Sequence, residues 1–591
     1  MCGILAVIGH IPEQGADLEA AIEALKARGP ESYGVNYISV NGSVNSSVNG
    51  AVFHFQRLAI QGVSGINGMQ PFNETGITWM CNGEIYNAKA LTHSLGKEYS
   101  NNSSDCAVIG ELYKTFGIER CLQMLDGVFG LAICDARDAS RTIVHVARDP
   151  FGVRPLYMLQ GDGWYVVASD VKSLSPLSMN GTSISQLPPG NFLTFECVSG
   201  KWICKSYVRY FRLRYSPEVV QSIELKNIGR DELTRIDELT RTMVNALVNA
   251  VFKRVSTVER PIACLLSGGL DSSLIVALVS KMYTGNLQTY CIGMPGSPDA
   301  KCASIVAKHL GINDHKCITV SQEKFFGAIP EVVAAIESYD TTTVRASVGN
   351  YLVAKSIAEI SDAKVVFNGD GSDEVTGGYI YMSEAGSDIK FDDECRRLLE
   401  NISSFDVLRS DRSISSNGLE PRTPFLDRTF VDSYLAIPAM YRYHKSKTPT
   451  ADAYWSQVEK ELINKGEIFV AECVHKRPEK LLLRYAIHRW LPNLLPVDIL
   501  WRSKEAFSDG VSSEGESWYE VIHRMLTYVE LPENIECENN HLAPTTKEQL
   551  YYRHIFNKLY PRAQQTIPYF WMPRWCETKD PSARTLKSYG K

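Results

Sequence analysis

The chain has 591 residues, of which 44% are hydrophobic and 22% charged, and its formal net charge is −6 at pH 7. One hydrophobic core does not organise a chain of this length, so at least two domains are expected. The small net charge gives no electrostatic footprint for nucleic acid or for an acidic membrane surface, and no stretch reaches the roughly 20 apolar residues that span a bilayer.

The 15 cysteines are scattered, without Cys-x-x-Cys pairs or a Cys/His group at zinc spacing along the sequence. Most are expected to be small buried side chains in a reducing compartment. The start Met1-Cys2-Gly3-Ile4 lacks the basic leader and long apolar run of a secretory signal. We therefore predict a cytoplasmic protein. Cys2 differs from the other cysteines. Its small side chain permits removal of Met1, and Cys2 then becomes the first residue.

The first 210 residues are rich in predicted strands. Short alternating runs between Gly, Asn and Asp turns predict strands at 34–40, 51–60, 77–81 and 130–135, and residues 41–50 read as a hairpin tip. Helices are predicted at 16–27 and 106–116. Strands covered by helices predict a layered sandwich.

The pattern changes after residues 188–190 and the mixed stretch 212–230. Apolar residues at three-and-four spacing predict a helix from residue 232. Strands at 262–266, 287–294 and 315–320 then alternate with helices at 270–283 and 300–310, which is typical of a doubly wound parallel sheet. After about residue 380 the pattern is mainly helical. We predict an α/β protein with two domains, 2–210 and 211–591.

A catalytic N-terminal cysteine needs no separate histidine, because its own α-amine, with an unperturbed pKa of about 8, can act as the base. The site also needs donors for an oxyanion and a grip on the substrate. Arg57, Asn82-Gly83-Glu84 and Asp105 are candidates. Taken singly, Arg57 could be a surface charge, Asn82-Gly83 a hairpin turn and Asp105 a helix N-cap.

Taken together, these motifs resemble the class II glutamine amidotransferase family. The resemblance rests on Cys2-Gly3-Ile4, Arg28-Gly29-Pro30, Arg57-Leu58-Ala59, Asn82-Gly83-Glu84, 125–129, Arg148-Asp149 and 152–157. It implies an αββα sandwich of the N-terminal-nucleophile hydrolase type, in which Cys2 attacks the side-chain amide of glutamine.

The same resemblance implies that Asn82 and Gly83 form the oxyanion hole. Arg57 would hold the α-carboxylate of glutamine, and Glu84 and Asp105 its α-amine. The implied glutamine site comprises Arg57, Leu58, Ala59, Ile60, Gln61, Asn82, Gly83, Glu84 and Asp105. The chain departs from the family pattern at Ala27, Glu31, Gln56, Gly62 and Ala107. These departures concern glutamine affinity more than the reaction.

The second candidate site begins at Ser267-Gly268-Gly269-Leu270-Asp271-Ser272-Ser273, between a predicted strand and helix. Small residues let the backbone close on a phosphate, and a helix N-terminus favours its charge. No Lys follows, so this is not a kinase-type loop but one that grips pyrophosphate. A plain strand-to-helix turn would explain two glycines but hardly all seven residues.

A second glycine-rich, acidic turn, Asn368-Gly369-Asp370-Gly371-Ser372-Asp373-Glu374, follows a predicted strand at 364–367. Both turns lie at carboxyl ends of strands, where ligands bind in doubly wound sheets. Carboxylates beside a triphosphate indicate Mg²⁺, with Asp271 and Asp373 as candidate ligands. A capping role for Asp373 is the alternative.

Later motifs are similar to the eukaryotic type of the asparagine synthetase family, in order from Cys2 to Arg584. They are 338–340, 343–347, 405–409, 422–427, 501–510, 571–575 and 580–584. The resemblance implies an ATP-pyrophosphatase domain with an ATP site at Leu266, Ser267, Gly268, Gly269, Asp271, Ser272, Ser273, Ile292, Asn368, Gly369 and Lys504. Asp370 would act on a β-aspartyl-AMP intermediate, although the family has Glu there and usually Ser at 368.

The implied reaction uses ATP and Mg²⁺ to amidate aspartate with ammonia from glutamine, through an interior passage that protects ammonia from protonation. Small-molecule substrates are the expected partners, without nucleic acid or membrane, and a homodimer stays open. Two alternatives remain. One is a relative with another acceptor, such as a β-lactam synthetase, against which Cys2 argues. The other is a regulatory or scaffold protein, which the Asp370 substitution favours.

Overall fold

The computed structural model describes residues 1–11, 17–39, 50–63, 68–100, 103–138, 141–198, 200–214, 232–504, 510–512, 515–578 and 580–581. Most of the predicted hairpin tip at 41–50 and most of the stretch 212–230 lie outside these ranges. So do residues 505–509 and Arg584 of the later motifs.

The N-terminal half contains two six-stranded antiparallel sheets. The first has the order β10 (Ser183–Gln186), β8 (Tyr157–Gln160), β9 (Tyr165–Ala168), β1 (Gly3–Ile8), β3 (Ala51–Arg57), β2 (Ser32–Ile38). The second has the order β12 (Lys201–Arg209), β11 (Asn191–Val198), β7 (Arg141–Arg148), β6 (Gly127–Asp138), β5 (Ile77–Ile85), β4 (Phe72–Glu74). The predicted strands are present, but β5 is longer than expected and includes Asn82-Gly83, so the hairpin-turn alternative is wrong.

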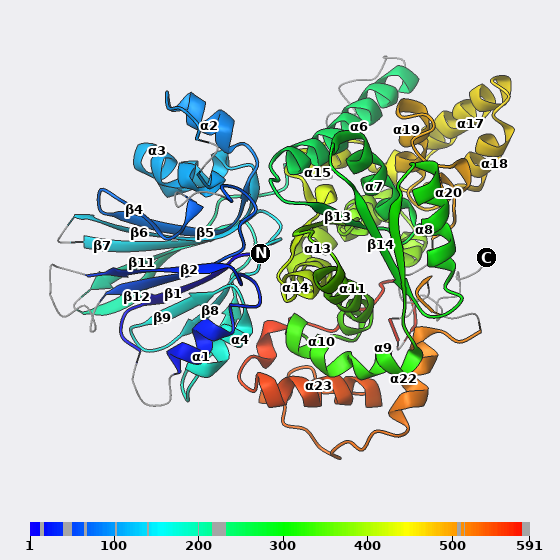
Figure 1. Ribbon diagram of the computed structural model, residues 1–591. Coiled ribbons are helices and arrows are strands. Elements are labelled where there is room, and N and C mark those ends of the chain that lie inside the picture. Colours follow the sequence, from blue (N-terminus) through cyan, green and yellow to red (C-terminus); the bar gives the residue numbers. More distant parts are fainter. Residues whose placement is uncertain are drawn as a thin grey trace.

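The two sheets pack face to face with a helical layer on each outer side (Figure 1). Alternate apolar residues of both sheets, including Ile4, Phe53, Met80 and Val146, form the core between them. Helices α2 (Ala88–Ser94) and α3 (Val108–Met124) cover the second sheet, and α1 (Leu18–Glu23) and α4 (Val171–Leu174) cover the first. The αββα sandwich predicted from the sequence is confirmed.

The C-terminal half is built on a five-stranded parallel sheet. Its order is β15 (Asp314–Thr319), β14 (Gln288–Gly293), β13 (Ile262–Leu265), β16 (Val365–Phe367), β17 (Glu420–Arg422). The strand order reverses between β13 and β16, which pair directly. The two glycine-rich turns follow these two strands, so both open onto the crevice where doubly wound sheets bind ligands. Strand β17 was not predicted, because three residues that include Pro421 show no period.

Helices cover both faces of this sheet. One face packs against α6 (Glu232–Ser256), α7 (Leu270–Met282) and α8 (Pro298–His309), and the other against α10 (Ile329–Ile336) and α11 (Thr341–Ile360). The mainly helical region after residue 380 is confirmed. It comprises α13 (Asp388–Asn401), α14 (Asp406–Ser415), α15 (Arg428–Leu435), α16 (Ala439–Arg442), α17 (Pro449–Asn464), α18 (Ile468–Lys476), α19 (Leu481–Trp490), α20 (Val497–Leu500), α22 (Trp518–Leu526) and α23 (Lys547–Leu559).

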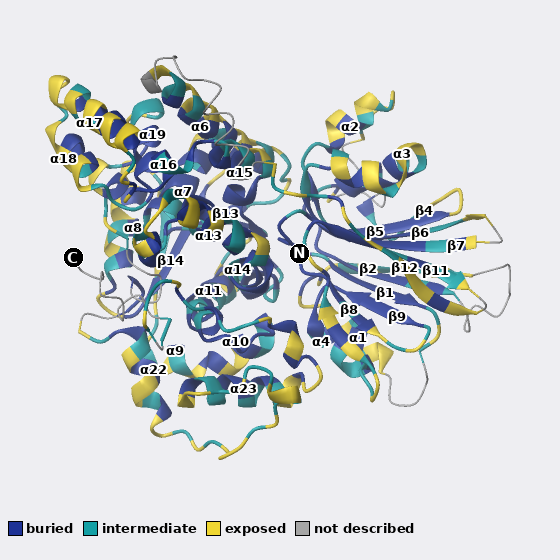
Figure 2. Cartoon of the chain, turned by 180° about the vertical axis from the view of Figure 1, so that it is seen from behind, coloured by how far each residue is buried: buried dark blue, intermediate teal, exposed yellow. Residues whose placement is uncertain are grey.

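Two short helices complete the C-terminal half: α9 (Gln322–Gly327) lies ahead of α10, and α12 (Ser372–Thr376) follows the second glycine-rich turn. Figure 2 shows that exposed residues gather on outlying helices such as α17 and α18, while the strands and central helices are mostly buried. None of the helices in the described ranges is long and apolar enough to cross a membrane.

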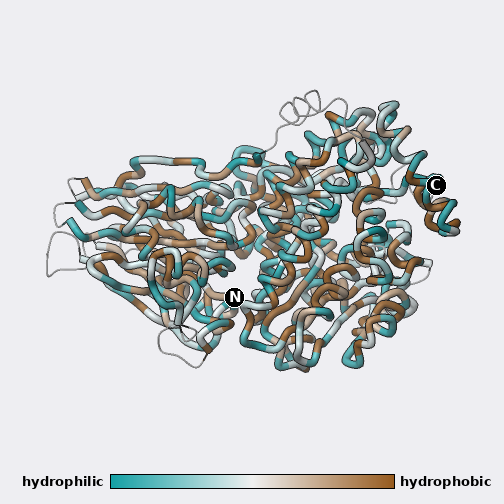
Figure 3. The backbone as a smooth tube through the Cα atoms, turned by 90° about the horizontal axis from the view of Figure 1, so that it is seen from above, coloured by the Kyte–Doolittle hydropathy of each residue, from teal (hydrophilic) through white to brown (hydrophobic). Residues whose placement is uncertain are grey.

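The two halves lie side by side along a broad boundary, and the N-terminus is at that boundary (Figures 1 and 3). Apolar residues of the N-terminal half, among them Leu58, Ile60 and Phe151, belong to the same buried cluster as residues of α6 and α15. Buried ion pairs also cross the boundary. Arg28 donates to Asp170 at 2.9 Å and to Asp411 of the other half at 2.8 Å. The halves are therefore fixed to each other by both apolar packing and charge.

We expect Arg28→Gln to lower the free energy of unfolding by about 3–5 kcal/mol, because Asp170 and Asp411 would stay buried and keep only the more distant Lys172 and Arg154, each at 3.3 Å. The three side chains are at most 2% exposed. Urea denaturation followed by tryptophan fluorescence measures the effect. The matched control is Lys201→Gln, whose partner Asp162 is 88% exposed, and which should change stability by less than about 1 kcal/mol. Equal midpoints in the two variants would contradict a role for Arg28 in joining the halves.

Candidate functional site

Cys2 lies immediately before strand β1, at the boundary between the two halves. Its thiol contacts the carbonyl oxygen of Leu58 at 3.6 Å, and its own carbonyl accepts from Arg28 Nε at 3.1 Å. Burial raises the pKa of the Cys2 thiol to about 11. Met1 is 1% exposed, its amine donates to the carbonyl of Leu419 at 3.0 Å, and burial lowers the pKa of this amine to about 5. A thiol with a pKa this high is protonated at neutral pH, so it needs a nearby base to act as a nucleophile.

Asn82 and Gly83 lie in β5 and are connected to the strand that follows Cys2. The hydroxyl of Ser169 accepts from the Ile4 amide at 3.0 Å and from Asn82 Nδ2 at 3.3 Å. The other side-chain atom of Asn82, Oδ1, is buried without a partner among the residues described. At Gly83 a Cβ would lie 2.1 Å from the carbonyl oxygen of Val128, so the close pairing with β6 requires glycine.

The segment after β3 is held from both halves of the molecule. Arg57 Nη2 donates to the carbonyls of Gln61 at 3.2 Å and Gly62 at 2.9 Å. Glu31, where the family pattern has Asp, accepts from the Ala59 amide at 2.7 Å and pairs with Arg260 at 2.8 Å. Glu31 thus anchors the predicted glutamine-binding loop to the C-terminal half.

Glu84 and Asp105 are buried carboxylates on either side of the end of β5. Glu84 accepts from Gln61 Nε2 at 2.7 Å and pairs with Arg422 of the C-terminal half at 3.0 Å. Burial raises the pKa of Glu84 well above its usual value, against the opposing charge of Arg422. Burial likewise raises the pKa of Asp105 to about 6, although its carboxylate accepts from the Ile85 amide at 2.5 Å.

The helix N-cap next to Asp105 is Ser104, whose hydroxyl accepts from the Cys106 amide. The N-cap alternative for Asp105 is therefore wrong. Its side chain instead fixes the end of the strand that carries Asn82, Gly83 and Glu84.

A pocket of about 200 Å³ opens at the carboxyl ends of β13 and β16. The turns that form it approach each other closely, since a Cβ on Gly369 would lie 2.8 Å from the Ser272 amide nitrogen. Gly268 has φ +74° and a Cβ there would lie 2.4 Å from Cys302 Cβ, so only glycine fits. The hydroxyls of Ser267 and Ser272 are 2.9 Å apart.

Most of the predicted ATP-site residues line this pocket. They are Leu266, Ser267, Gly269, Asp271, Ser272, Ile292, Asn368, Gly369 and Lys504, together with the predicted Asp370 and Asp373. Two predicted residues do not line it. The carbonyl of Gly268 accepts from Arg502 at 3.2 Å, and Ser273 is fully buried in α7.

Lysine side chains connect the acidic residues of the pocket. Lys480 Nζ lies 2.6 Å from Asp271 Oδ2 and 2.6 Å from Asp373 Oδ1, and Lys504 Nζ lies 2.5 Å from Asp373 Oδ2. Burial would raise the pKa of Asp373, but the two lysines outweigh it and lower this pKa. Burial would lower the pKa of Lys504, but Asp373 outweighs it and raises this pKa to about 12.

Lys480 was missed by the sequence reasoning. It precedes α19 with φ +57° and is 209 residues from Asp271. No motif surrounds it. Its burial would have marked it as unusual, but burial cannot be read from the sequence. Ser372, Asp406 and Arg409 also line the pocket without an assigned role, although each stands in a quoted motif.

Asp370 borders the pocket next to a cation. Its Oδ1 pairs with Arg409 at 3.3 Å, and its Oδ2 is buried without a partner in the described part of the chain. Burial raises the pKa of Asp370 to about 6, against the opposing charge of Arg409. Asn368 Oδ1 accepts from the Asp370 amide at 3.3 Å, and Asn368 Nδ2 donates to Ser410 at 2.8 Å. The two residues that depart from the family pattern are thus in direct contact.

Other quoted motifs hold the chain together rather than border the pocket. Asp340 accepts from the Trp571 amide at 2.8 Å, and Arg345 pairs with Glu548 at 2.5 Å and with Asp580 at 2.8 Å. The carboxylate of Asp149 accepts from four backbone amides, those of Phe129, Phe151, Val153 and Arg154. These motifs position the segments that carry the site.

An αββα sandwich with a thiol at the start of its first strand, joined to a doubly wound sheet with two glycine-rich turns, defines a two-domain amidotransferase. Residues 1–213 match the Glutamine amidotransferase domain, and residues 243–390 and 383–579 match Asparagine synthase. The chain belongs to the asparagine synthase family.

Individual relatives are similar to this protein over its whole length. It is 38% identical to "Asparagine synthetase [glutamine-hydrolyzing]" of Gallus gallus and 36% identical to that of Homo sapiens, in both cases over 100% of this chain and 99% of the relative. A solved structure, glutamine phosphoribosylpyrophosphate amidotransferase from B. subtilis, is 19% identical with a TM-score of 0.28, covering 54% of this chain and 65% of that one.

Proposed function

We propose that this protein synthesises asparagine from aspartate and ATP with ammonia released from glutamine, and forms AMP, pyrophosphate and glutamate. The observation that carries the proposal is the presence of both sites in one chain: Cys2 before the strand that Ser169 connects to the buried Asn82, and a pocket between the turns at 267–273 and 368–374. The family membership and the 36–38% identity to glutamine-hydrolysing asparagine synthetases support it. Residues 2–210 would act as the glutaminase part and 211–591 as the synthetase part.

In the glutaminase part, removal of Met1 would free the α-amine of Cys2 as the base for its thiol. The thiolate would attack the side-chain amide of glutamine, and Asn82 and Gly83 would stabilise the oxyanion. Arg57 would bind the α-carboxylate, and Glu84 and Asp105 the α-amine. Collapse of this oxyanion intermediate would expel ammonia and leave a glutamyl thioester, which water would then hydrolyse to glutamate and free Cys2. The side-chain amide of Asn82, which is buried and oriented by its contact with Ser169, and the tight packing of Gly83 support a preorganised site.

In the synthetase part, the aspartate side-chain carboxylate would attack ATP to give β-aspartyl-AMP and pyrophosphate, which turns its oxygen into a leaving group. Ser267, Gly269, Ser272 and Lys504 would hold the pyrophosphate. Asp370 would act on the intermediate when ammonia attacks. Its partnerless Oδ2 and its pKa of about 6 support a role in proton transfer near neutral pH.

Mg²⁺ would be held by Asp271 and Asp373. Both carboxylates border the pocket, and oxygen ligands are those that Mg²⁺ prefers, which supports this assignment. When bound, the ion would neutralise phosphate charge. Lys480 already bridges the two carboxylates and would keep them oriented.

Ammonia would pass between the sites inside the protein. Met1 contacts Leu419, which directly precedes β17, and β17 pairs with β16, whose end carries Asn368 and Asp370. The passage would follow this connection between the two sites. The 15 cysteines, all of which lie in the described ranges, form no disulfide, which supports the proposal of a cytoplasmic location. A homodimer is also proposed, and light scattering of the purified protein tests it.

Mass spectrometry of the product formed from aspartate, ATP and amide-¹⁵N-glutamine tests the reaction. We expect ¹⁵N-asparagine together with AMP and pyrophosphate. A different amidated acceptor would favour the β-lactam synthetase type of relative. No pyrophosphate at all would favour a scaffold protein.

We expect Asp370→Glu alone to lower the rate of asparagine synthesis. The longer side chain would move its oxygens by about 1 Å, and such displacements can cost about a hundredfold in a positioned site. Asn368→Ser together with Asp370→Glu should recover part of the loss, because the two residues share a hydrogen bond. Asparagine formation in all four combinations measures this. A single Asp370→Glu that is faster than the wild type would mean that the native site is impaired.

A further inference from the structure

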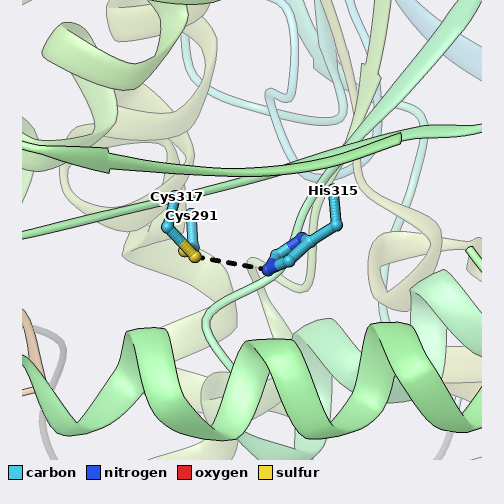
Figure 4. A group of neighbouring side chains, drawn as sticks. All are labelled: Cys291, His315 and Cys317. Atoms are coloured by element: carbon cyan, nitrogen blue, oxygen red, sulfur yellow. Dashed lines mark hydrogen bonds between the residues drawn. The ribbon is translucent and has the colours of Figure 1, made fainter. Parts of the chain in front are cut away.

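Three metal-binding side chains meet on the parallel sheet, outside the pocket residues assigned above. Cys291 on β14 and Cys317 on β15 are direct cross-strand partners, and so are Thr289 and His315 two residues earlier. The Sγ atoms of Cys291 and Cys317 are 2.7 Å apart, and Cys317 Sγ is 3.3 Å from His315 Nε2 (Figure 4). One ligand atom from each of the three residues lies within 4.8 Å of the others.

The imidazole of His315 is held with one nitrogen towards the sulfur atoms. Its Nδ1 is 3.0 Å from the hydroxyl of the buried Thr289. A hydrogen bond at one ring nitrogen fixes the ring and its tautomer, as in metal-ligating histidines generally. With Nδ1–H donating to Thr289, Nε2 has its lone pair free and faces Cys317. Two neighbouring thiols without a metal would not require a histidine oriented in this way.

The cluster is reachable from solvent on one side. Cys291 is buried and Cys317 is exposed. A cavity of about 220 Å³ borders Cys317 and is lined also by Gly293, Ser297 and Ala300. It gives an ion access to the Cys317 thiol and has room for a water molecule as a fourth ligand.

We propose that Cys291, His315 and Cys317 bind a Zn²⁺ ion with water in the fourth position. Two thiolates and an imidazole are a ligand set that Zn²⁺ takes in tetrahedral geometry. On binding, each thiol loses its proton to solvent and forms a bond to the metal, so no oxidant is needed. At Zn–S bonds of about 2.3 Å the two sulfur atoms must lie about 3.8 Å apart. Rotation of the exposed Cys317 side chain provides this opening.

The site lies behind a wall of the nucleotide pocket, because Cys291 also lines that pocket. The proposal does not depend on the proposed reaction, since it rests on residues of β14 and β15 that have no assigned role in it. A second three-residue group with metal-ligand atoms close together in the described ranges is that of His523, Glu548 and Asp580. It carries no such proposal, because Arg345 already pairs with both of its carboxylates.

Titration of the tag-free, full-length protein with Co²⁺, under argon and with a non-thiol reductant, tests the proposal. We expect one equivalent to bind and to give near-ultraviolet thiolate-to-cobalt charge transfer with the visible bands of tetrahedral Co²⁺. Zn²⁺ should then displace the cobalt and abolish both signals. The charge-transfer band should be weaker in Cys317→Ser, and His315→Ala should bind Co²⁺ at least about tenfold more weakly.

Cys204→Ser is the matched control, because Cys204 is an exposed cysteine on β12 of the other half, and its titration should equal that of the wild type. Circular dichroism verifies that each variant is folded, and Cys317→Ala serves as a second variant if Cys317→Ser is not. Unchanged cobalt spectra in both the Cys317 and the His315 variants would place the metal elsewhere and overturn the proposal. So would the absence of binding to the reduced wild type, including the case in which mass spectrometry finds only a Cys291–Cys317 disulfide before reduction.

Discussion

Cys2→Ala should abolish glutamine hydrolysis while synthesis from added ammonium salts stays largely intact. The thiol is the proposed nucleophile, and removal of a nucleophile that acts as a unit with its base costs on the order of 10⁴-fold or more. The loss should be confined to one activity, because Cys2 contacts Leu58 and Arg28 of the N-terminal half and is not among the described residues that line the pocket at 267–273 and 368–374. Glutamate release and ammonium-driven asparagine formation, measured in parallel, separate the two activities.

A short peptide left ahead of Cys2 should have the same effect as the substitution, because the α-amine would then be part of a peptide bond. Met1 is already buried against Leu419, so residues placed before it would also have to displace packed structure. The matched control is Cys197→Ala, another part-buried cysteine of the sandwich, which should hydrolyse glutamine at the wild-type rate. Normal hydrolysis by a tagged, uncleaved protein would rule out the N-terminal nucleophile.

Asp271→Asn should have the opposite effect: glutaminase activity survives and pyrophosphate release falls. Loss of a carboxylate that holds a metal ion against a transferring phosphoryl group should cost on the order of a hundredfold or more. Asp271 accepts from Ser372 at 2.8 Å and pairs with Lys480 at 2.6 Å, so its loss also removes one of the two carboxylates that hold Lys480. Pyrophosphate release from ATP and aspartate is the measurement.

Asp452→Asn is the control for this substitution. Asp452 lies in the same half, its side chain is 53% exposed and it pairs with Arg477, so the exchange should leave both activities unchanged. Lys480 keeps its contact with Asp373 in the Asp271→Asn variant, which limits the loss of stability. Pyrophosphate release at an ordinary rate would mean that Asp271 only holds Lys480 and that the metal lies elsewhere.

The alternation of strands and helices was predictable from the sequence, because it depends on local periodicity. The two glycine-rich turns were also predictable. At Gly268 and Gly369 a side chain would collide with a neighbouring segment, so only glycine fits, and these glycines are visible in the sequence. The class of the N-terminal site followed from Cys2 and from short motifs that each fold within one strand or turn. The sequence by itself therefore determined the fold class, the family and the two turns between which the pocket opens.

The partners of the charged residues were decided only by the tertiary structure. Lys480 meets Asp271 across 209 residues of chain, and Arg422 meets Glu84 across the boundary between the halves. A buried charge requires a partner of opposite charge because desolvation is costly. The sequence around the charged residue does not show which residue is that partner. The cluster of Cys291, His315 and Cys317 arises in the same way, since the register of two parallel strands brings together residues 26 apart that no spacing rule connects.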